Sequence, residues 1–390
     1  MRILIHMGDS FTDNGPNSKR MATFADAFVK NGHSVTVLTP KCEGSVSDEK
    51  IRVIQCSMFC SQNKSSLGRM VAQLSYGLFS LFSSFKAGKV DVVITTTPPA
   101  LISPAGWLIA KAKKSALVYD VRDIWPDVAL EMGSFKKGSI YDKWFSRVRD
   151  FMLRKSDLVT AVSPGKVKKL SDYPHKSDVI YITNGFDKRF LDNVDDKDVI
   201  SKYRLTSSFT CVYVGKLGLA QGLSSLLKLA SKAKAESLSA RFLLFGAGVE
   251  EAALREQVEE MKLDNVEFCG IIPNAQVYTI LKNADMCYVP LVNGNLTDSV
   301  PTKLYEALGC GCPVLLSARG DSVDILSESE LGYSASPNDS EALWDAFMKI
   351  YSKKDWTIEK EKAYKYMTTK YSRQAAAEKM SDELARRFDN

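Results

Sequence analysis

One loop and the short helix after it combine acids, a lysine and a proline in a spacing that suits an anion with hydroxyl groups. The stretch TDSVPTKLYEALGCGCPVLL (297–316) places Asp298 and Glu306 eight positions apart, with Pro301 and Lys303 between them. Proline suits a first helical turn, so we predict a helix from about Pro301 to the glycines before PVLL. Free N–H groups at a helix start favour phosphate, and carboxylates accept hydrogen bonds from hydroxyls. A nucleotide sugar has both groups; the alternative is an acid beside a helix start and one solvated glutamate.

Two further loops in the same half follow apolar, β-branched runs and are rich in glycine. Lys216 comes directly after the run FTCVYVG, and Gln221 opens the next helix. A diphosphate needs both amide donors and positive charge, which Lys216 and Lys303 would supply from adjacent loops. Glycine lets a backbone approach a ligand closely because it has no Cβ. These glycines are Gly215, Gly218, Gly246 and Gly248, and a base or ribose would lie against the last two.

The loop GDSFTDNGPNSKR after the first apolar run is a third candidate. Gly8 and Gly15 make it flexible, and we predict that Ser18 caps a helix whose first turn contains Lys19 and Arg20. Backbone amides at such a helix start approach an anion closely. The glycine spacing does not fit G-x-G-x-x-G, which disfavours a nicotinamide enzyme. The alternative is an ordinary strand-to-helix loop.

Composition indicates an ordinary globular protein. A chain of 390 residues with 45% apolar and 25% charged residues predicts two domains. No apolar run reaches the roughly 18 residues of a spanning helix, and the N-terminus is a first strand rather than a signal peptide, so we expect a cytoplasmic protein. The pairs Cys56/Cys60 and Cys310/Cys312 resemble metal spacings, but with three histidines in all we interpret the eight cysteines as reduced core thiols. Residues 1–190 carry a net charge of +11 and residues 191–390 a net charge of −5.

The chain repeats an alternation of apolar runs and helical segments that is typical of parallel sheets covered on both faces. We predict an acceptor-binding domain at 1–188, a nucleotide-sugar domain at 189–370 and a C-terminal helix at 371–390 that crosses back to the first domain. Ligands of such sheets bind beyond the carboxyl ends of the strands, so two facing domains would form a cleft. Asp195, Asp196 and Asp198 are interpreted as a solvated linker cluster rather than a metal site. The predicted strands are 2–7, 34–39, 90–96, 116–121, 157–163, 209–215, 240–248, 265–270, 284–291 and 312–318.

The motifs together resemble a known family. GKLGLAQG, FGAGVEEAAL, NVEFCGIIPNAQVYTILKNADMCYVPL and DSVPTKLYEALGCGCPVL resemble, in this order, the second half of GT-B glycosyltransferases of family 4, which retain the anomeric configuration. NGHSVTVLT, SDLVTAVSPGKVKKL and ITNGFD are similar to first-half landmarks. Within the family, the chain is most similar to bacterial O-antigen enzymes of the L-fucosamine (FucNAc) transferase type. The resemblance implies an α/β fold of two Rossmann-like, doubly wound domains facing a cleft.

The resemblance also implies roles for individual residues. Glu306 matches the acid that binds the ribose, and Asp298 stands where a glutamate would contact the donor sugar. Lys216 stands where an arginine is common, and Gln221 stands where a lysine is common. Lys303 would compensate for the charge that is lost at Gln221. Arg122 and Asp123, in LVYDVRDIWPD, lie where many members have a catalytic histidine and would orient the sugar or the acceptor; a structural corner is the alternative. The remaining donor-binding residues are Gly15, Gly215, Gly246, Gly248 and Ile272.

The expected partners are a UDP-sugar, bound without a metal cofactor, and an undecaprenyl-diphosphate-linked saccharide at the inner face of the cytoplasmic membrane, without nucleic acid. Segments 64–89 and 135–155 combine apolar and basic residues and would contact an anionic membrane surface, the alternative for each being a buried helix. The rival functions are a UDP-sugar 2-epimerase and a non-catalytic membrane- or nucleic-acid-binding module. Segment 64–89 carries Leu67, Met70, Val71, Leu74, Leu78, Leu81, Phe82 and Phe85 at mainly helical spacing, with Lys64, Arg69, Lys86 and Lys89 at its ends.

Overall fold

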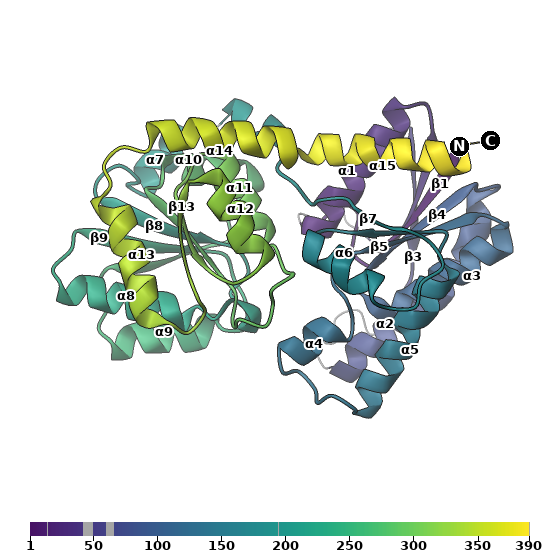
Figure 1. Cartoon of the computed structure of the whole chain (residues 1–390), viewed down its shortest axis with the longest axis horizontal. Coiled ribbons are helices and arrows are strands. Elements are labelled where there is room, and N and C mark those ends of the chain that lie inside the picture. The colour runs from purple at the N-terminus through teal and green to yellow at the C-terminus, as the bar shows by residue number, and fades with distance from the viewer. Residues whose placement is uncertain (14, 42–49, 60–65, 194, 390) are drawn as a thin grey trace. The chain divides into compact units, whose positions relative to one another are not determined.

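The computed structural model describes the chain except residues 14, 42–49, 60–65, 194 and 390, and divides it into two units (Figure 1). Unit 1 comprises Met1–Asn184 and Arg373–Asn390, and unit 2 comprises Gly185–Ser372. Gly185 has a φ of 65°, a left-handed conformation that glycine adopts without strain. The chain passes from unit 1 to unit 2 between Asn184 and Gly185, a few residues before the predicted boundary.

Unit 1 contains a seven-stranded, all-parallel sheet in the order β3-β2-β1-β4-β5-β6-β7. The five predicted strands are confirmed, and two edge strands, β3 and β7, were not predicted. Short edge strands are weakly marked in sequence because only one side is paired. The strands are β1 (Arg2–His6), β2 (Ser34–Pro40), β3 (Ile51–Cys56), β4 (Val92–Thr97), β5 (Ala116–Val121), β6 (Leu158–Ala161) and β7 (Val179–Tyr181).

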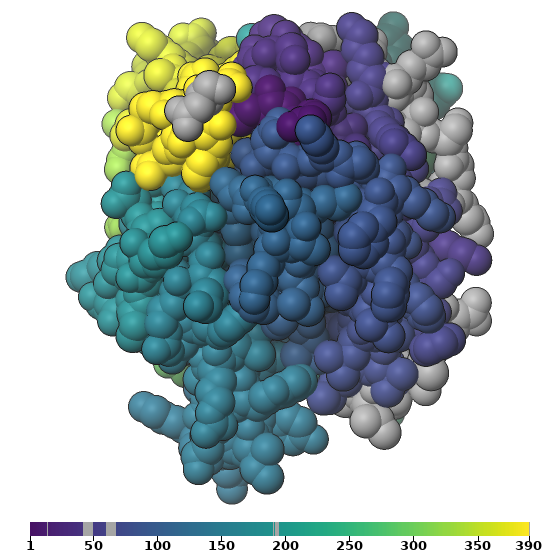
Figure 2. Space-filling view, turned by 90° about the vertical axis from the view of Figure 1, so that its right-hand side faces the viewer, coloured from purple at the N-terminus to yellow at the C-terminus, as the bar shows by residue number. Residues whose placement is uncertain are grey.

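Helices cover both faces of this sheet (Figure 1). Phe24 and Phe28 pack on one face together with Met380 and Leu384 from the C-terminal helix, and Tyr76 belongs to the cluster on the other face. Figure 2 shows α15, in yellow, beside the purple N-terminal residues. The helices are α1 (Pro16–Lys30), α2 (Ser66–Ser84), α3 (Ser103–Lys113), α4 (Asp127–Glu131), α5 (Ile140–Lys155), α6 (Pro164–Ser171) and α15 (Arg373–Phe388), with 3₁₀ turns η1 (Phe85–Ala87) and η2 (Ala100–Ile102).

A buried ion pair joins α1 to the strand ends of unit 1. Arg20 Nη2 lies 2.8 Å from Asp120 Oδ1, and the two side chains are 2% and 0% exposed. Arg20 also donates to the carbonyl oxygens of Ile182 and Thr183, and the Thr160 hydroxyl donates to Asp120. Burial raises the pKa of Asp120, but the attraction of Arg20 and these hydrogen bonds outweigh it and hold that pKa below its usual value. This stabilisation is present above about pH 4 and is lost as pH falls through the lowered pKa.

The prediction for the start of α1 was wrong. The helix begins at Pro16 with Gly15 as its cap, so Ser18 lies inside the first turn and not at the cap. Arg20 is not a free cation at an anion-binding loop, because its guanidinium is occupied by Asp120 and backbone carbonyl oxygens. Because proline suits the first helical turn, the helix starts three residues earlier than a Ser18 cap would place it.

Unit 2 contains a six-stranded, all-parallel sheet in the order β10-β9-β8-β11-β12-β13, again with helices on both faces (Figure 1). The five predicted strands are confirmed; β13 was not predicted. The strands are β8 (Phe209–Val214), β9 (Ala240–Phe245), β10 (Val266–Gly270), β11 (Met286–Pro290), β12 (Val314–Ser317) and β13 (Gly332–Ala335). The helices are α7 (Lys197–Lys202), α8 (Ser224–Ala235), α9 (Glu251–Glu260), α10 (Asn274–Asn283), α11 (Thr302–Gly309), α12 (Asp321–Ser329), α13 (Ser340–Ser352) and α14 (Thr357–Lys370), with η3 (Lys188–Asn193) and η4 (Leu219–Gln221).

We predict that Arg20→Met lowers the free energy of unfolding of unit 1 by about 3–5 kcal/mol, because it leaves the Asp120 carboxylate buried and unpaired. Urea denaturation followed by hydrogen exchange of unit 1 peptides measures the loss. The double variant Arg20→Met/Asp120→Asn removes both charges and should be more stable than Arg20→Met alone. A double variant as unstable as the single one, or less stable, would contradict an electrostatic origin.

Candidate functional site

The loops at the carboxyl ends of the unit 2 strands are bonded to one another. The amide of Gly215, after β8, donates to Phe245 O at the end of β9, and that of Leu217 donates to Ala247 O. The loop after β11 joins them, because Val292 N donates to Ala220 O. Parallel strands bring all their carboxyl ends to one edge, so residues far apart in sequence form one surface.

The glycines of these loops are required by contacts between backbones. A Cβ on Gly246 would lie 1.9 Å from Gly215 O, and a Cβ on Gly248 would lie 1.9 Å from Leu217 O. Gly246 also has a φ of +134°. These two glycines were predicted to let a base or ribose lie against the backbone. In the structure they instead allow a close approach of the loop after β8.

A lysine, a tyrosine and a backbone carbonyl connect α11 to the loop after β8. Lys303 Nζ donates to Tyr213 Oη at 2.9 Å and lies 4.1 Å from the centre of its ring. Tyr213 Oη donates in turn to Lys216 O at 2.7 Å. Burial lowers the pKa of Lys303 to about 8, because its amine is removed from water and its hydrogen-bond partner is neutral. The two lysines assigned to diphosphate therefore belong to one bonded group.

Tyr213 was not among the residues predicted for the site. Its signal was a tyrosine at the end of the otherwise apolar strand FTCVYV, where a buried phenol needs a hydrogen-bond partner. A Cβ on the neighbouring Gly215 would lie 2.9 Å from Lys303 Nζ, so this glycine gives room to the lysine.

The two candidate acids lie on either side of the start of α11. The predicted helix is confirmed, with Pro301 as its cap rather than its first residue. Glu306 lies on α11, one turn after Lys303, and is partly exposed, whereas Asp298 is 9% exposed. The Asp298 loop is held against α12, because Asp321 N donates to Thr297 O and Ser322 Oγ to Ser299 O.

The other predicted donor-binding residues of unit 2 lie in the same set of strand-end loops. Lys216 is exposed and has no ion pair within the part of the chain that the structure describes. Gln221 ends η4, and Gly222 after it has a φ of 56° and approaches the backbone of Val292. Ile272 follows β10 and is partly exposed.

The two candidate catalytic residues of unit 1, Arg122 and Asp123, have different surroundings. Arg122 donates to Thr96 Oγ1 and Pro98 O, and burial lowers the pKa of its guanidinium. Asp123 is 40% exposed and lies 4.0 Å from Lys166 Nζ. Arg122 is therefore used in holding the strand-end loops, and Asp123 is the more accessible of the two.

Two further residues of unit 1, His6 and Gly15, have different surroundings. His6 bonds Thr95 and Ser80, and complete burial lowers its pKa to about 4, so it is a neutral core residue. A Cβ on Gly15 would meet no atom within 4 Å, which leaves space at the start of α1.

Across the described ranges, no group of three or more His, Cys, Asp or Glu side chains has a metal-binding arrangement. Asp196 caps α7 by accepting from the amides of Asp198 and Val199, and Asp195 pairs with Lys282. Cys310 and Cys312 are buried thiols whose pKa values are raised by burial. Cys60 lies outside the described residues.

Comparison with known proteins assigns both halves of the chain. Residues 18–190 match the family model described as Glycosyltransferase Family 4, and residues 196–371 match Glycosyl transferases group 1. The chain is 25% identical to a Pseudomonas aeruginosa protein named as a probable glycosyltransferase, WbjE, over 74% of each chain. It is 24% identical to WcaI of Escherichia coli K12, named as a colanic acid biosynthesis glycosyl transferase, over 68% of this chain and 67% of the other. The solved structure of Anabaena Alr3699/HepE in complex with UDP and glucose has 17% identity and a TM-score of 0.75, covering 99% of this chain and 100% of the other.

The two doubly wound sheets have the GT-B fold. The first half of the chain belongs to the family 4 glycosyltransferases and the second half to the group 1 glycosyltransferases, so the protein is a glycosyltransferase. The predicted fold and enzyme class are thus confirmed, and the relatives named above lend no support to the epimerase alternative.

We predict that UDP affinity is steady up to about pH 8 and then falls, approaching tenfold per pH unit, because free Lys303 loses its proton there while a bound diphosphate would hold it. Titration calorimetry at pH 7.5–9 measures this. Lys303→Arg keeps its charge throughout the range and should remove the decline, although its affinity at pH 7.5 differs. A decline of equal slope in both proteins would remove Lys303 from the diphosphate site.

Proposed function

We propose that this enzyme is a retaining glycosyltransferase that moves a sugar from UDP to a lipid-linked saccharide during synthesis of a surface polysaccharide. The observation that carries the proposal is the bonded group of Lys303, Tyr213 and Lys216 at the start of α11, with Glu306 one turn away. The UDP and glucose bound to Alr3699/HepE and the colanic acid role in the name of WcaI support it. The resemblance to FucNAc transferases makes N-acetyl-L-fucosamine the first donor sugar to test.

The donor would be held by unit 2. The diphosphate accepts hydrogen bonds from the first amides of α11 and is neutralised by Lys303 and Lys216. Glu306 accepts hydrogen bonds from the ribose, and Asp298 from the sugar. The diphosphate's negative charge is then met by amines and amides, so the proposal requires no metal ion. Gln221, Gly215, Gly246, Gly248 and Ile272 complete the surface against the nucleotide.

Transfer would break the bond between the anomeric carbon and the leaving phosphate oxygen and form a bond from the acceptor oxygen to the same face of that carbon. The acceptor hydroxyl proton passes to the leaving phosphate, so UDP departs without a protein nucleophile. Lys303 and Lys216 stabilise the negative charge that grows on the diphosphate. Asp123 would orient the acceptor hydroxyl, and Arg122 would position Asp123 by fixing the strand-end loop that carries both residues.

An exposed apolar stripe on α2 and η1 is the observation that supports a lipid-linked acceptor. Its members are 38–64% exposed and recur every three or four residues, so they line one helical face. Arg69, Lys86 and Lys89 are exposed along the same segment, and cations beside apolar side chains suit the interface of an anionic bilayer. The stripe comprises Val71, Leu74, Leu78, Phe82 and Phe85.

Other parts of the two segments are not available for such a surface, or are not described. Phe145 and Met152 of α5 are buried, whereas Ile140 and Tyr141 at its start are exposed. Lys64 and the side chain of Leu67 lie outside the described residues. No helix in the described ranges has the length and hydropathy to cross a membrane. We therefore propose peripheral contact, at the inner face of the cytoplasmic membrane, through the α2 stripe.

We predict that Glu306→Ala raises the Kd for UDP by about tenfold to a hundredfold, since a hydrogen bond to a charged group contributes roughly 1.5–3 kcal/mol. Asp298→Ala should lower kcat more than it weakens UDP binding. Calorimetry with chelator present and transfer assays with UDP-sugars measure both. Glu259→Ala, an exposed acid on α9, is the matched control. Wild-type kinetics in both folded variants would refute the site.

We predict that Leu74→Glu/Leu78→Glu/Phe82→Glu lowers partitioning onto anionic vesicles at least tenfold. The reason is that charged side chains replace apolar ones that would be buried in the bilayer interface. Activity on a lipid-linked acceptor should fall, while activity on a water-soluble analogue is retained. Ile358→Glu, a comparably exposed apolar residue on α14, is the control. Equal vesicle binding by the triple variant would exclude α2 as the membrane contact.

A further inference from the structure

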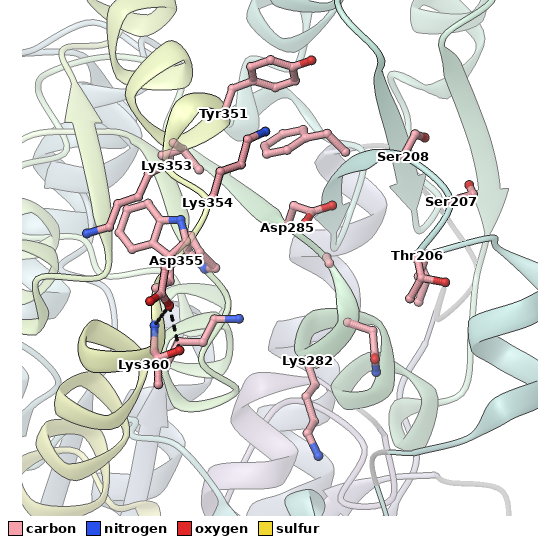
Figure 3. A pocket seen from close by; sticks show the side chains of 18 residues that line it. Thr206, Ser207, Ser208, Lys282, Asp285, Tyr351, Lys353, Lys354, Asp355 and Lys360 are labelled. Atoms are coloured by element: carbon pink, nitrogen blue, oxygen red, sulfur yellow. Dashed lines mark hydrogen bonds between the residues drawn. The ribbon is translucent and has the colours of Figure 1, made fainter.

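Unit 2 has a second candidate site at the edge of its sheet opposite the strand-end loops. A pocket of about 630 Å³ opens beside the residues that lead into β8, β11 and β12 (Figure 3). Phe209 is the first residue of β8, and Asp285 and Pro313 immediately precede β11 and β12. The segment from α13 to α14 forms the other wall. In parallel strands the amino ends share one edge, so this pocket is separate from the proposed donor site.

Four lysines and two acids, Asp285 and Asp355, line the pocket, and two of the four lysines have no ion pair in the described part of the chain. Lys282 and Lys353 bond Asp195 and Glu359. Lys354 and Lys360 have no ion pair within the residues that the structure describes. A small pocket lined by two unpaired ammonium groups attracts an anion, and a phosphate group suits them because each lysine donates in several directions.

Both unpaired lysines act on the one acid that leads into β11. Burial raises the pKa of Asp285, and the positive charges of Lys360 and Lys354 act in the opposite direction. Figure 3 shows Lys354 between Tyr351 and Asp285. Asp285 Oδ2 accepts from Thr210 N at 2.8 Å, which fixes the carboxylate at the floor of the pocket.

The remaining walls suit a polyol. Trp356 and Tyr351 belong to the lysine side of the pocket, where Lys353 lies over the Trp356 ring and Lys354 over the Tyr351 ring. Thr206, Ser207 and Ser208 line the side opposite the lysines. A carboxylate accepts hydrogen bonds from hydroxyls and repels a second anion, so Asp285 favours a ligand whose phosphate and hydroxyls are on different atoms. Binding sites for small molecules commonly have volumes of this size.

We propose that this pocket binds a phosphorylated sugar, with its phosphate on Lys354 and Lys360 and a hydroxyl on Asp285. This ligand is additional to the donor and acceptor, and its binding does not depend on the proposed transferase reaction. The pocket and the donor loops lie at opposite ends of β8, β11 and β12, so both ligands can be bound together.

The test is calorimetry of glucose 1-phosphate, glucose 6-phosphate, glucose and inorganic phosphate with the full chain, repeated with saturating UDP. A sugar phosphate should bind in both conditions and more tightly than glucose or inorganic phosphate. Lys354→Ala/Lys360→Ala should weaken that binding at least tenfold and leave UDP binding unchanged. Lys365→Ala, an exposed lysine on the same helix as Lys360, should bind like wild type.

Asp285→Asn separates the two parts of the proposal. It keeps an oxygen for Thr210 N but removes the charge, so inorganic phosphate should bind more tightly and the preference for a sugar phosphate should shrink. Displacement of the sugar phosphate by UDP, equal binding by the folded double-lysine variant, or no binding of either sugar phosphate would overturn the proposal. Equal affinity of wild type for phosphate and sugar phosphate would overturn the role of Asp285.

Discussion

The arrangement of the donor-side loops depends on the close contact between the loops after β8 and β9. Gly246 and Gly248 lie where any Cβ would overlap the carbonyl oxygens of Gly215 and Leu217. Because the two backbones touch, they exchange hydrogen bonds and form one rigid surface. Tyr213 reaches Lys216 O from beneath that surface and holds Lys303 beside it. The position of the charged group thus follows from a steric constraint on two glycines.

The two units each place a buried cation at the carboxyl ends of their strands, with different consequences. Arg20 in unit 1 is fully bonded to Asp120 and to carbonyl oxygens, so its charge is neutralised inside the protein. Lys303 in unit 2 bonds a phenol, and burial lowers its pKa to about 8 although the charge of Glu306 acts in the opposite direction. A cation whose charge is only partly compensated within the protein gains from an anionic ligand. This contrast makes Arg20 structural and supports Lys303 as a ligand-binding residue.

The sheet of unit 2 presents different chemistry at its two edges. Its carboxyl edge combines helix amides, Lys303, Lys216 and two acids around loops that are bonded to each other. Its amino edge has the pocket lined by Lys354, Lys360 and Asp285. Both arise because parallel strands collect residues from distant parts of the sequence at each end. The topology that builds the proposed donor site thus also builds the pocket proposed for a sugar phosphate.

The sequence by itself determined the two parallel sheets, because buried strands of β-branched residues alternate with helical segments and leave a periodic signal. It also located the helix with Lys303 and Glu306, since proline and glycine mark its ends locally. Tertiary structure decided the rest. Arg20 became a buried partner of Asp120, a residue 100 positions away, and Gly246 became a contact for Gly215. Tyr213 and the pocket at the amino edge likewise depend on neighbours that only folding brings together. Local signals give the elements, whereas the partner of each charge or hydroxyl is fixed by which strand ends meet.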